Sequence, residues 1–432
     1  MRKITWSGPV TQATVAKHLP RAKVTIESAL SDADRLIQDV RSRGVSALLD
    51  HAEQFDGVRP KFLKVPPSDR RAALAELGPE LREAIELAIA RVRKVSKENV
   101  PSEKVTELAF GAAVTTRYRA VDSVGVYVPG GKAVYPSSVI MNVVAAQEAG
   151  VPRIALASPA QKSFDGLPHP AILATAELLG VEEIYSIGGA SAVAAFAYGV
   201  AEIDLEPVRM VTGPGNIYVA AAKRLLRGTI GIDSEAGPTE ILIVADETAN
   251  PTFIAADLIS QAEHDENAAA VLVTHSGELL AAVESELEKQ LAKTQNRERV
   301  SISLAAIQSA LVLTESLAVS IEIANEYATE HLEIQTRQSV EVADKISNAG
   351  AIFIGSYSPV SLGDYLAGSN HVLPTGEQAK FGPGLGVHTF LRPQQVVDYS
   401  EGALREVSQS LEIFANAEGL SAHGDAARIR FE

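Results

Sequence analysis

The chain has 432 residues, of which 46% are hydrophobic and 22% charged, and its formal net charge is −15 at pH 7. Single hydrophobic cores stop growing near about 250 to 300 residues, so this length predicts more than one domain. The acidic balance argues against a nucleic-acid-binding face. The chain has no cysteine, which excludes disulfides and a thiol nucleophile and fits a reducing compartment.

The N-terminal part of the chain predicts a polar arm followed by helices. Residues 1–24 contain few core-forming side chains and no apolar stretch of a secretory signal, so we expect a cytoplasmic protein. Apolar spacing predicts helices over 31–55 and 68–97, with Asp32 and Ser68 as N-terminal caps. After residue 101 the pattern becomes strand-like.

The central part of the chain alternates strands and helices, which indicates crossover units and parallel sheets. The run 184–201 is uncharged and about long enough to span a bilayer, but Gly188 and Gly189 divide it into a strand and an Ala-rich helix. The expected strands are 114–118, 123–128, 154–158, 183–187, 208–211, 240–245, 270–274, 311–314 and 351–354. The expected helices are 169–179, 191–198, 217–226, 252–263, 278–293, 317–328 and 340–347, and a turn is expected at Pro129, Gly130 and Gly131.

These elements predict an α/β protein with two Rossmann-like parallel-sheet domains, a small N-terminal arm and a helical C-terminal tail. A second series of strands and helices begins at residue 239, so we expect a domain boundary near residues 232–239. Beyond about residue 378 a Gly/Pro-containing loop leads to a helix expected over 394–416. The expected units are the arm 1–24, a first α/β domain of 25–122 plus 239–378, a second of 123–238, and the tail 379–432.

Four segments far apart in the chain combine histidine with acidic or amide neighbours. They are QAEHDE at 261–266, EH at 330–331, the loop 361–375 with Asp364 and His371, and EGLSAH at 418–423. Without cysteine, such segments offer a metal only nitrogen and oxygen ligands, and they offer acid/base groups for proton transfer.

Each segment also has a structural explanation. Gln261 and His264 lie three residues apart near a predicted helix end, so they can share a face, but a histidine there also complements the helix dipole. Glu330 and His331 suit general-base chemistry, and a solvated surface pair is the alternative. The loop 361–375 shows neither helical nor strand periodicity. Functional loops often lack such periodicity, but a plain connecting loop lacks it too.

Two glycine-rich turns join strands to helices. Gly188–Gly189 and the GPGN turn at 213–216 would let backbone amides approach a pyrophosphate. Neither turn matches G-x-G-x-x-G, so tight packing turns explain them equally well.

Taken together, these segments resemble the histidinol dehydrogenase family over nearly the whole chain. The order and joint presence of the motifs carry the resemblance. The motifs are VGVYVPGG at 124–131, YPSS at 135–138, GPGN at 213–216, AGPTE at 236–240, DLISQAEH at 257–264, EHL at 330–332, GDY at 363–365, NHVLPT at 370–375 and EGLSAH at 418–423.

The resemblance implies a zinc-dependent enzyme that oxidises L-histidinol to L-histidine through the aldehyde with two NAD. It implies metal ligands at Gln261, His264, Asp364 and His423, with one Zn²⁺ per subunit. The implied substrate contacts are Thr239, Gln261, His264, His331, Asp364, His371, Glu418 and His423. The implied NAD contacts in the second domain are Tyr127, Ser191 and Asn216. The resemblance further implies a homodimer that exchanges C-terminal segments, so that Glu418 and His423 enter the partner's site.

The residue chemistry agrees with these implied roles. Neutral His331 can take the alcohol proton as hydride leaves, and Glu330 can then activate water to attack the aldehyde. A thiohemiacetal would need a cysteine, so water attack is the available route. Zinc would mainly orient the substrate, and a site without sulfur could also accept manganese or cobalt.

The chain departs from the family pattern at a few positions. Ser191 stands where many members have a glutamine that touches NAD, which puts that contact in doubt. Thr239 replaces the more usual serine and keeps the hydroxyl. The segment 381–388 is richer in glycine than the usual version.

Three other functions fit parts of the pattern. A sister dehydrogenase of the same fold would oxidise another primary alcohol, such as a sulfonated diol, but the retained His371, Glu418 and His423 favour an imidazole substrate. A zinc hydrolase would use Glu330 to activate water and need no nucleotide. A metal-dependent binding protein would leave the pair at 330–331 without a role.

Overall fold

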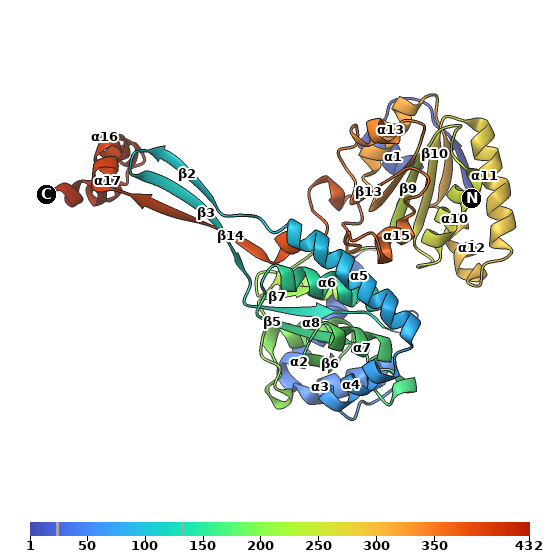
Figure 1. Ribbon diagram of the computed structural model, residues 1–432, viewed down its shortest axis with the longest axis horizontal. Coiled ribbons are helices and arrows are strands. Elements are labelled where there is room, and N and C mark those ends of the chain that lie inside the picture. The colour runs from blue at the N-terminus through green and yellow to red at the C-terminus, as the bar shows by residue number, and fades with distance from the viewer. Residues whose placement is uncertain (23–25, 131–133) are drawn as a thin grey trace.

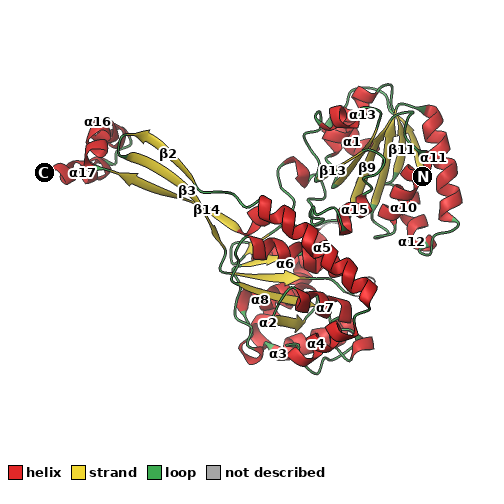
Figure 2. Ribbon diagram, viewed as in Figure 1, coloured by secondary structure: helices red, strands yellow, loops and turns green. Residues whose placement is uncertain are grey.

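A computed structural model describes residues 1–22, 26–130 and 134–432, which form two α/β units and an extended arm (Figures 1 and 2). The α/β class and the two parallel sheets expected from the sequence are confirmed. Gly131, the end of the expected turn and of the VGVYVPGG motif, lies outside the described residues, as does the expected boundary at residues 24 and 25. No helix in the described ranges is long and apolar enough to cross a membrane.

One unit is built on a parallel six-stranded sheet in the order β1-β11-β10-β9-β12-β13. The central strand β9 is buried on both faces: Ile241 and Ile243 pack in one hydrophobic core, and Leu242 and Val244 pack in the core on the opposite face. Buried parallel strands are accordingly continuous in hydrophobicity rather than alternating. The strands are β1 Arg2–Thr5, β9 Glu240–Ala245, β10 Ala269–Thr274, β11 Ala310–Leu313, β12 His331–Gln335 and β13 Ala351–Ile354.

Helices cover both faces of this sheet (Figure 1). One face carries α10 Pro251–Ala262, α11 Gly277–Leu291 and α12 Arg297–Ala305, and the other carries α1 Gln12–His18, α13 Leu317–Tyr327 and α14 Ser339–Ala343. The helix α12 was not expected from the sequence, since its apolar residues are few. A short helix, α15 Val360–Tyr365, follows β13 and packs near α10.

The expected polar N-terminal arm is wrong. The strand β1 pairs in parallel with β11, and Trp6, Val15 and Leu19 are buried in the core of the six-stranded sheet. The scattered apolar side chains of this segment did not reveal an edge strand, because its pairing depends on β11, about 300 residues away in the chain.

The second unit contains a parallel five-stranded sheet in the order β6-β5-β4-β7-β8. The strands are β4 Ser123–Tyr127, β5 Arg153–Ser158, β6 Glu183–Ser186, β7 Met210–Thr212 and β8 Gly231–Ile232. Two helices line each face: α6 Pro136–Glu148 and α7 Pro170–Leu178 on one, and α8 Gly189–Tyr198 and α9 Ile217–Leu226 on the other. The strand order changes direction between β4 and β7, where such sheets open a crevice for ligands.

The helices of residues 30–98 belong with this five-stranded sheet, which corrects the expected assignment of 25–122 to the first domain. The chain forms α2 Leu30–Arg43, α3 Val45–His51, the short π-helix η2 Ala52–Asp56, α4 Pro67–Glu76 and α5 Pro79–Glu98. The helix α2 packs on α8 and α9, α4 on α7, and α5 on α6. Their amphipathic faces could serve either sheet, so the sequence pattern alone did not select one.

The helix ends also differ from expectation. Ala29 precedes α2 and Pro66 precedes α4, and neither makes a side-chain cap, so Asp32 and Ser68 are not the caps. Each long periodic stretch is interrupted near a glycine, Gly44 in the first and Gly78 in the second.

An antiparallel arm leaves the five-stranded unit and carries the C-terminal helices at its far end (Figure 1). It consists of β2 Lys104–Ala109, β3 Ala112–Ala120 and β14 Leu391–Tyr399, followed by α16 Glu401–Ala417 and α17 Ser421–Arg428. The expected helix over 394–416 is therefore wrong at its start, because residues 394–399 form a strand paired with β3. The arm exposes Val105, Leu108, Phe110 and Val397, and α16 exposes Ile413 and Phe414.

Candidate active site

The expected catalytic segments meet at the amino edge of the six-stranded sheet. Thr239 directly precedes β9. Beside it, Glu330 directly precedes β12 and His331 is the first residue of that strand. Gln261 and His264 lie at the carboxyl end of α10, which runs back to the same edge. Open α/β sheets usually bind ligands at their carboxyl edge, so this location was not predictable from the fold class.

A chain of hydrogen bonds links the amide and carboxylate groups. Gln261 Nε2 donates to Thr239 Oγ1 at 2.6 Å, and Thr239 Oγ1 donates to Glu330 Oε2 at 2.5 Å. The backbone N–H of Glu240 also donates to Glu330 Oε2, at 3.0 Å. This chain turns the carbonyl oxygen of Gln261 away from Thr239, where that buried oxygen has no hydrogen-bond partner within the described residues. A buried acceptor without a donor is costly, so it is a candidate ligand atom.

His331 is held as a neutral imidazole with one free nitrogen. Its Nδ1 lies 3.1 Å from the carbonyl oxygen of Glu240, which can only accept, so the ring proton sits on Nδ1. Its Nε2 is buried and has no partner in the described part of the chain. Burial lowers the pKa of His331 to about 4. Nε2 can therefore accept a proton at neutral pH.

Glu330 lies beside this imidazole, with 3.5 Å between its Oε2 and His331 Nδ1. Burial raises the pKa of Glu330 well above its ordinary value, and the hydrogen bonds from Thr239 and Glu240 only partly oppose this. In its ionised form, a carboxyl group with a raised pKa is a stronger base than an ordinary glutamate. The backbone of Gly350 packs against Glu330, since a β-carbon there would lie 2.5 Å from the Glu330 carbonyl oxygen.

Asp364 faces His264 across the same site. His264 Nε2 and Asp364 Oδ2 are 3.9 Å apart, and burial raises the pKa of Asp364. His371 Nδ1 donates to the backbone carbonyl of Asp364 at 2.9 Å. Ser138 Oγ of α6 can donate to His371 Nε2 at 3.2 Å, which links this loop to the five-stranded unit. Burial lowers the pKa of His371 to about 4.

Three of the four metal ligands expected from the sequence lie near one another, and the fourth does not. Across residues 1–22, 26–130 and 134–432, no three His, Cys, Asp or Glu side chains are placed to hold a metal. Gln261, His264 and Asp364 do gather, and their amide oxygen, imidazole and carboxylate fit a zinc ion that lacks thiolate ligands. His423 and Glu418 do not join them within one chain, because both lie at the far end of the arm (Figure 1).

The sequence interpretation assigned no role to Glu240, which organises the site. Its backbone contacts both Glu330 and His331, and its buried side chain accepts from Arg21 Nε at 2.7 Å and from the N–H of Gly376 at 3.0 Å. Arg21 also stacks on the ring of Tyr327, 4.1 Å from its centroid. The sequence feature that could have indicated a role for Glu240 is its position directly after Thr239.

The expected nucleotide contacts gather at the carboxyl edge of the five-stranded sheet. Tyr127 ends β4, and its hydroxyl oxygen accepts the N–H of Gly189 at 3.1 Å, with burial raising its pKa to about 12. Asn216 Oδ1 caps α9 by accepting the N–H groups of Tyr218 and Val219 at 3.0 and 3.2 Å. Ser191 is buried, and its hydroxyl donates to His51 Nδ1 at 2.9 Å. These side chains shape the glycine turns that would receive a dinucleotide.

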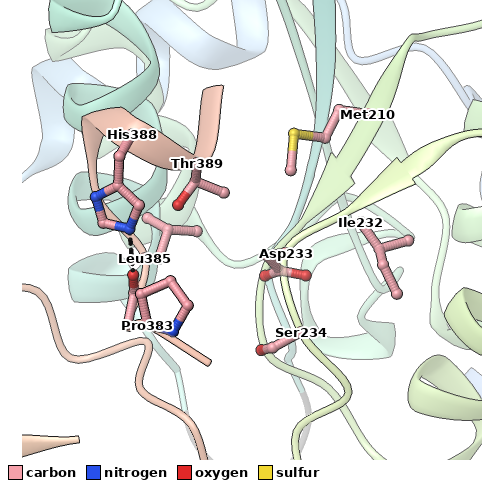
Figure 3. Close-up of a pocket in the computed structure, with 9 residues that line it drawn as sticks. Met210, Ile232, Asp233, Ser234, Pro383, Leu385, His388 and Thr389 are labelled. Atoms are coloured by element: carbon pink, nitrogen blue, oxygen red, sulfur yellow. Dashed lines mark hydrogen bonds between the residues drawn. The ribbon is translucent and has the colours of Figure 1, made fainter. Parts of the chain in front are cut away.

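A cavity of about 230 Å³ opens elsewhere, between the β7–β8 edge and the loop before the arm (Figure 3). Met210, Ile232 and Asp233 line one side, and Leu385 and His388 the other. His388 Nε2 donates to the carbonyl of Gly384 at 3.0 Å. None of the expected site residues lines this cavity, so it is separate from the catalytic edge.

Comparisons with known proteins agree on one family. The family model described as histidinol dehydrogenase matches residues 19–431. Histidinol dehydrogenases from Leifsonia xyli and Thermobifida fusca are 54% and 55% identical, over 98% and 95% of this chain and 97% and 94% of theirs. A crystal structure of histidinol dehydrogenase from Elizabethkingia anophelis matches with a TM-score of 0.94 at 31% identity, covering 99% of this chain and 98% of that one. Sequence motifs, fold and full-length similarity together show that the chain belongs to the histidinol dehydrogenase family.

Proposed function

We propose that the protein oxidises L-histidinol to L-histidine through L-histidinaldehyde and reduces two NAD per turnover. The family supplies the substrate, and the observation that carries the chemistry is the free Nε2 of neutral His331 beside Glu330 at one buried edge. A binding protein would leave the free imidazole nitrogen no proton to accept, and a hydrolase would form no NADH.

The metal we propose is one Zn²⁺ per subunit, held by Gln261, His264 and Asp364 with His423 of the partner subunit. The unpartnered Oε1 of Gln261 and the facing His264 and Asp364 side chains support this ligand set. When bound, the cation would orient the imidazole and amine of the substrate. Thr239, His371 and Glu418 of the partner subunit would complete the substrate contacts.

In the first oxidation, His331 Nε2 accepts the hydroxyl proton of the substrate while the carbinol hydride passes to NAD. Burial keeps the pKa of His331 near 4, so the ring enters this step unprotonated and Nε2 needs no prior loss of a proton. In the second, Glu330 accepts a proton from the water that attacks the aldehyde, and a second hydride passes to another NAD. The first oxidation releases one proton. The second releases two, one from the attacking water and one from the remaining hydroxyl of the hydrated aldehyde, and yields the ionised carboxylate.

We propose a homodimer in which each arm delivers Glu418 and His423 to the partner's site. The arm and α16 expose large apolar side chains, among them Phe110 at 102% and Phe414 at 71%. Apolar surface of this kind commonly marks an interface. A second copy of this chain is the occupant that would also supply the missing metal ligand.

The first experiment measures NADH formation after adding L-histidinol to the purified protein. We expect two NADH per histidinol consumed, loss of activity on chelation, and recovery with zinc. Absence of NADH would refute the dehydrogenase function and favour a hydrolase or binding protein. Activity on a sulfonated diol in place of histidinol would favour the sister dehydrogenase.

Subunit mixing tests the shared site. His331→Asn and His423→Ala should each be inactive alone, but a mixed dimer would contain one intact site if His423 acts across the interface. Random mixing makes half of the dimers mixed, so about a quarter of wild-type activity should return. No recovery in dimers shown to be mixed would place both residues in the site of one chain.

A further inference from the structure

An acidic side chain lies beside the glycine turn that follows β6. Asp56 ends the π-helix η2, and its Oδ2 lies 3.2 Å from where a β-carbon on Gly188 would stand. Pro159, which follows β5, touches the same position. π-Helical turns are rare and frequently occur at functional sites. The carboxylate of Asp56 is therefore at the carboxyl edge of the five-stranded sheet, where the turns that would receive NAD are found.

Within the described residues, Asp56 has no hydrogen-bond or ion-pair partner, unlike the carboxylates on the neighbouring turns. Asp39 and Asp50 both pair with Arg43, and Glu53 pairs with Arg59. Asp56 makes no hydrogen bond or ion pair within the described ranges of the chain, and burial raises its pKa to about 6. Holding a half-buried carboxylate without donors costs free energy that a bound ligand with hydroxyl groups would recover.

The topology places Asp56 at the adenosine end of a dinucleotide. The strand order reverses between β4 and β7, so the crevice for a pyrophosphate lies there. The turn at Gly188 follows β6, which is two strands from β4, or roughly 10 Å at the usual strand spacing. Asn216 lies on the other side of the crevice, after β7. This separation suits the two halves of an extended dinucleotide.

We propose that Asp56 accepts hydrogen bonds from the adenosine ribose hydroxyls of NAD and thereby excludes NADP. This inference rests on the proposed NAD-dependent function and names the residue that selects the cofactor. A carboxylate here attracts the 2′-hydroxyl as a donor and repels a 2′-phosphate. Phe55, 58% exposed in the same turn, offers an aromatic surface next to this ribose.

The test replaces Asp56 with asparagine, which keeps the shape and removes the charge. We expect the KM for NAD to rise about tenfold, because a hydrogen bond to a charged group is lost. The ratio of kcat/KM for NADP to that for NAD should rise at least tenfold, while kcat with saturating NAD stays unchanged. In isothermal titration, ADP-ribose should bind the variant more weakly than the wild type, which reports binding of the adenosine half without turnover.

Glu53→Gln is the matched control, because it removes the same charge from the same turn but at an exposed residue paired with Arg59. It should leave both cofactor constants unchanged. Asp56→Asn should melt no lower than wild type, since it removes an unpaired carboxylate. A purely structural role would instead lower the melting temperature and leave the NADP to NAD ratio unchanged, which would overturn the inference.

Failure of the proposed role of Asp56 and failure of the proposed function give different results. If the wild type reduces NAD with histidinol but Asp56→Asn keeps wild-type constants for NAD and NADP, the role of Asp56 is refuted and the proposed function stands. If the wild type forms no NADH from histidinol, the proposed function itself has failed.

Discussion

Replacing Glu333 with leucine tests whether this buried side chain positions the helix that carries Asp364. Glu333 lies in β12, is 1% exposed, and accepts the N–H of Val360 with Oε1 at 2.9 Å. Its Oε2 accepts Gln335 Nε2 at 3.1 Å. Burial and the neighbouring Asp257 raise the pKa of Glu333 well above its usual range, and the two carboxyl groups share a hydrogen bond.

The expected loss follows from the groups left unpaired. Glu333→Leu strips Val360 of its acceptor and Asp257 of one donor, although Asp257 keeps Gln335 Nε2 at 3.2 Å. Each unpaired buried group costs about 1–3 kcal/mol, and the apolar surface of leucine recovers about 1 kcal/mol. We expect the free energy of unfolding to fall by about 1–5 kcal/mol. Glu333→Gln keeps an acceptor and a donor, so its loss should stay below about 1 kcal/mol.

The same substitution should weaken metal binding. Val360 is the first residue of α15, the helix that carries Asp364, and the preceding Pro359 offers no side-chain cap. Glu333 therefore accepts a backbone N–H of the first turn of this helix. Loss of a group that orients a ligand typically costs 10- to 100-fold in metal affinity. Urea unfolding and zinc competition with a chelator measure the two effects. Wild-type affinity in Glu333→Leu, or equal damage from leucine and glutamine, would refute the reasoning.

Three further predictions concern the same site. His331→Asn should slow NADH formation from histidinol by about 10²–10⁴-fold, whereas Glu330→Gln should accumulate the aldehyde; unimpaired histidine formation from histidinaldehyde would contradict the role of Glu330. Gly350→Ala should lower the melting temperature and activity together, because its new methyl group would lie 2.5 Å from the Glu330 carbonyl oxygen, while Gly277→Ala, with open space around it, should do neither. Between pH 6.5 and 4 the wild type should lose more stability than His371→Asn, because His371, with its pKa lowered to about 4, gains a proton only on unfolding; parallel unfolding curves would exclude this.

Local patterns predicted the central elements well. The continuous apolar runs at 240–245 and 270–274 became β9 and β10, and the split at Gly188 and Gly189 separated β6 from α8 as expected. Such strands are buried on both faces, so their continuous apolar sequence is enough to predict that they are buried. The strand β14 of the antiparallel arm was not predicted, because its residues are exposed and mixed in polarity. It forms by pairing with β3, about 280 residues earlier in the chain.

By itself, the sequence determined the α/β alternation, the absence of thiol chemistry and the segments that carry catalytic groups. Only the tertiary structure decided that Glu330, His331 and Gln261 meet at the amino edge of one sheet, and that α2–α5 cover the other. It also decided the protonation of His331, because burial and the carbonyl of Glu240 set its pKa and its tautomer. Spacing along a chain encodes local periodicity, whereas burial and long-range contacts arise only when distant segments pack together.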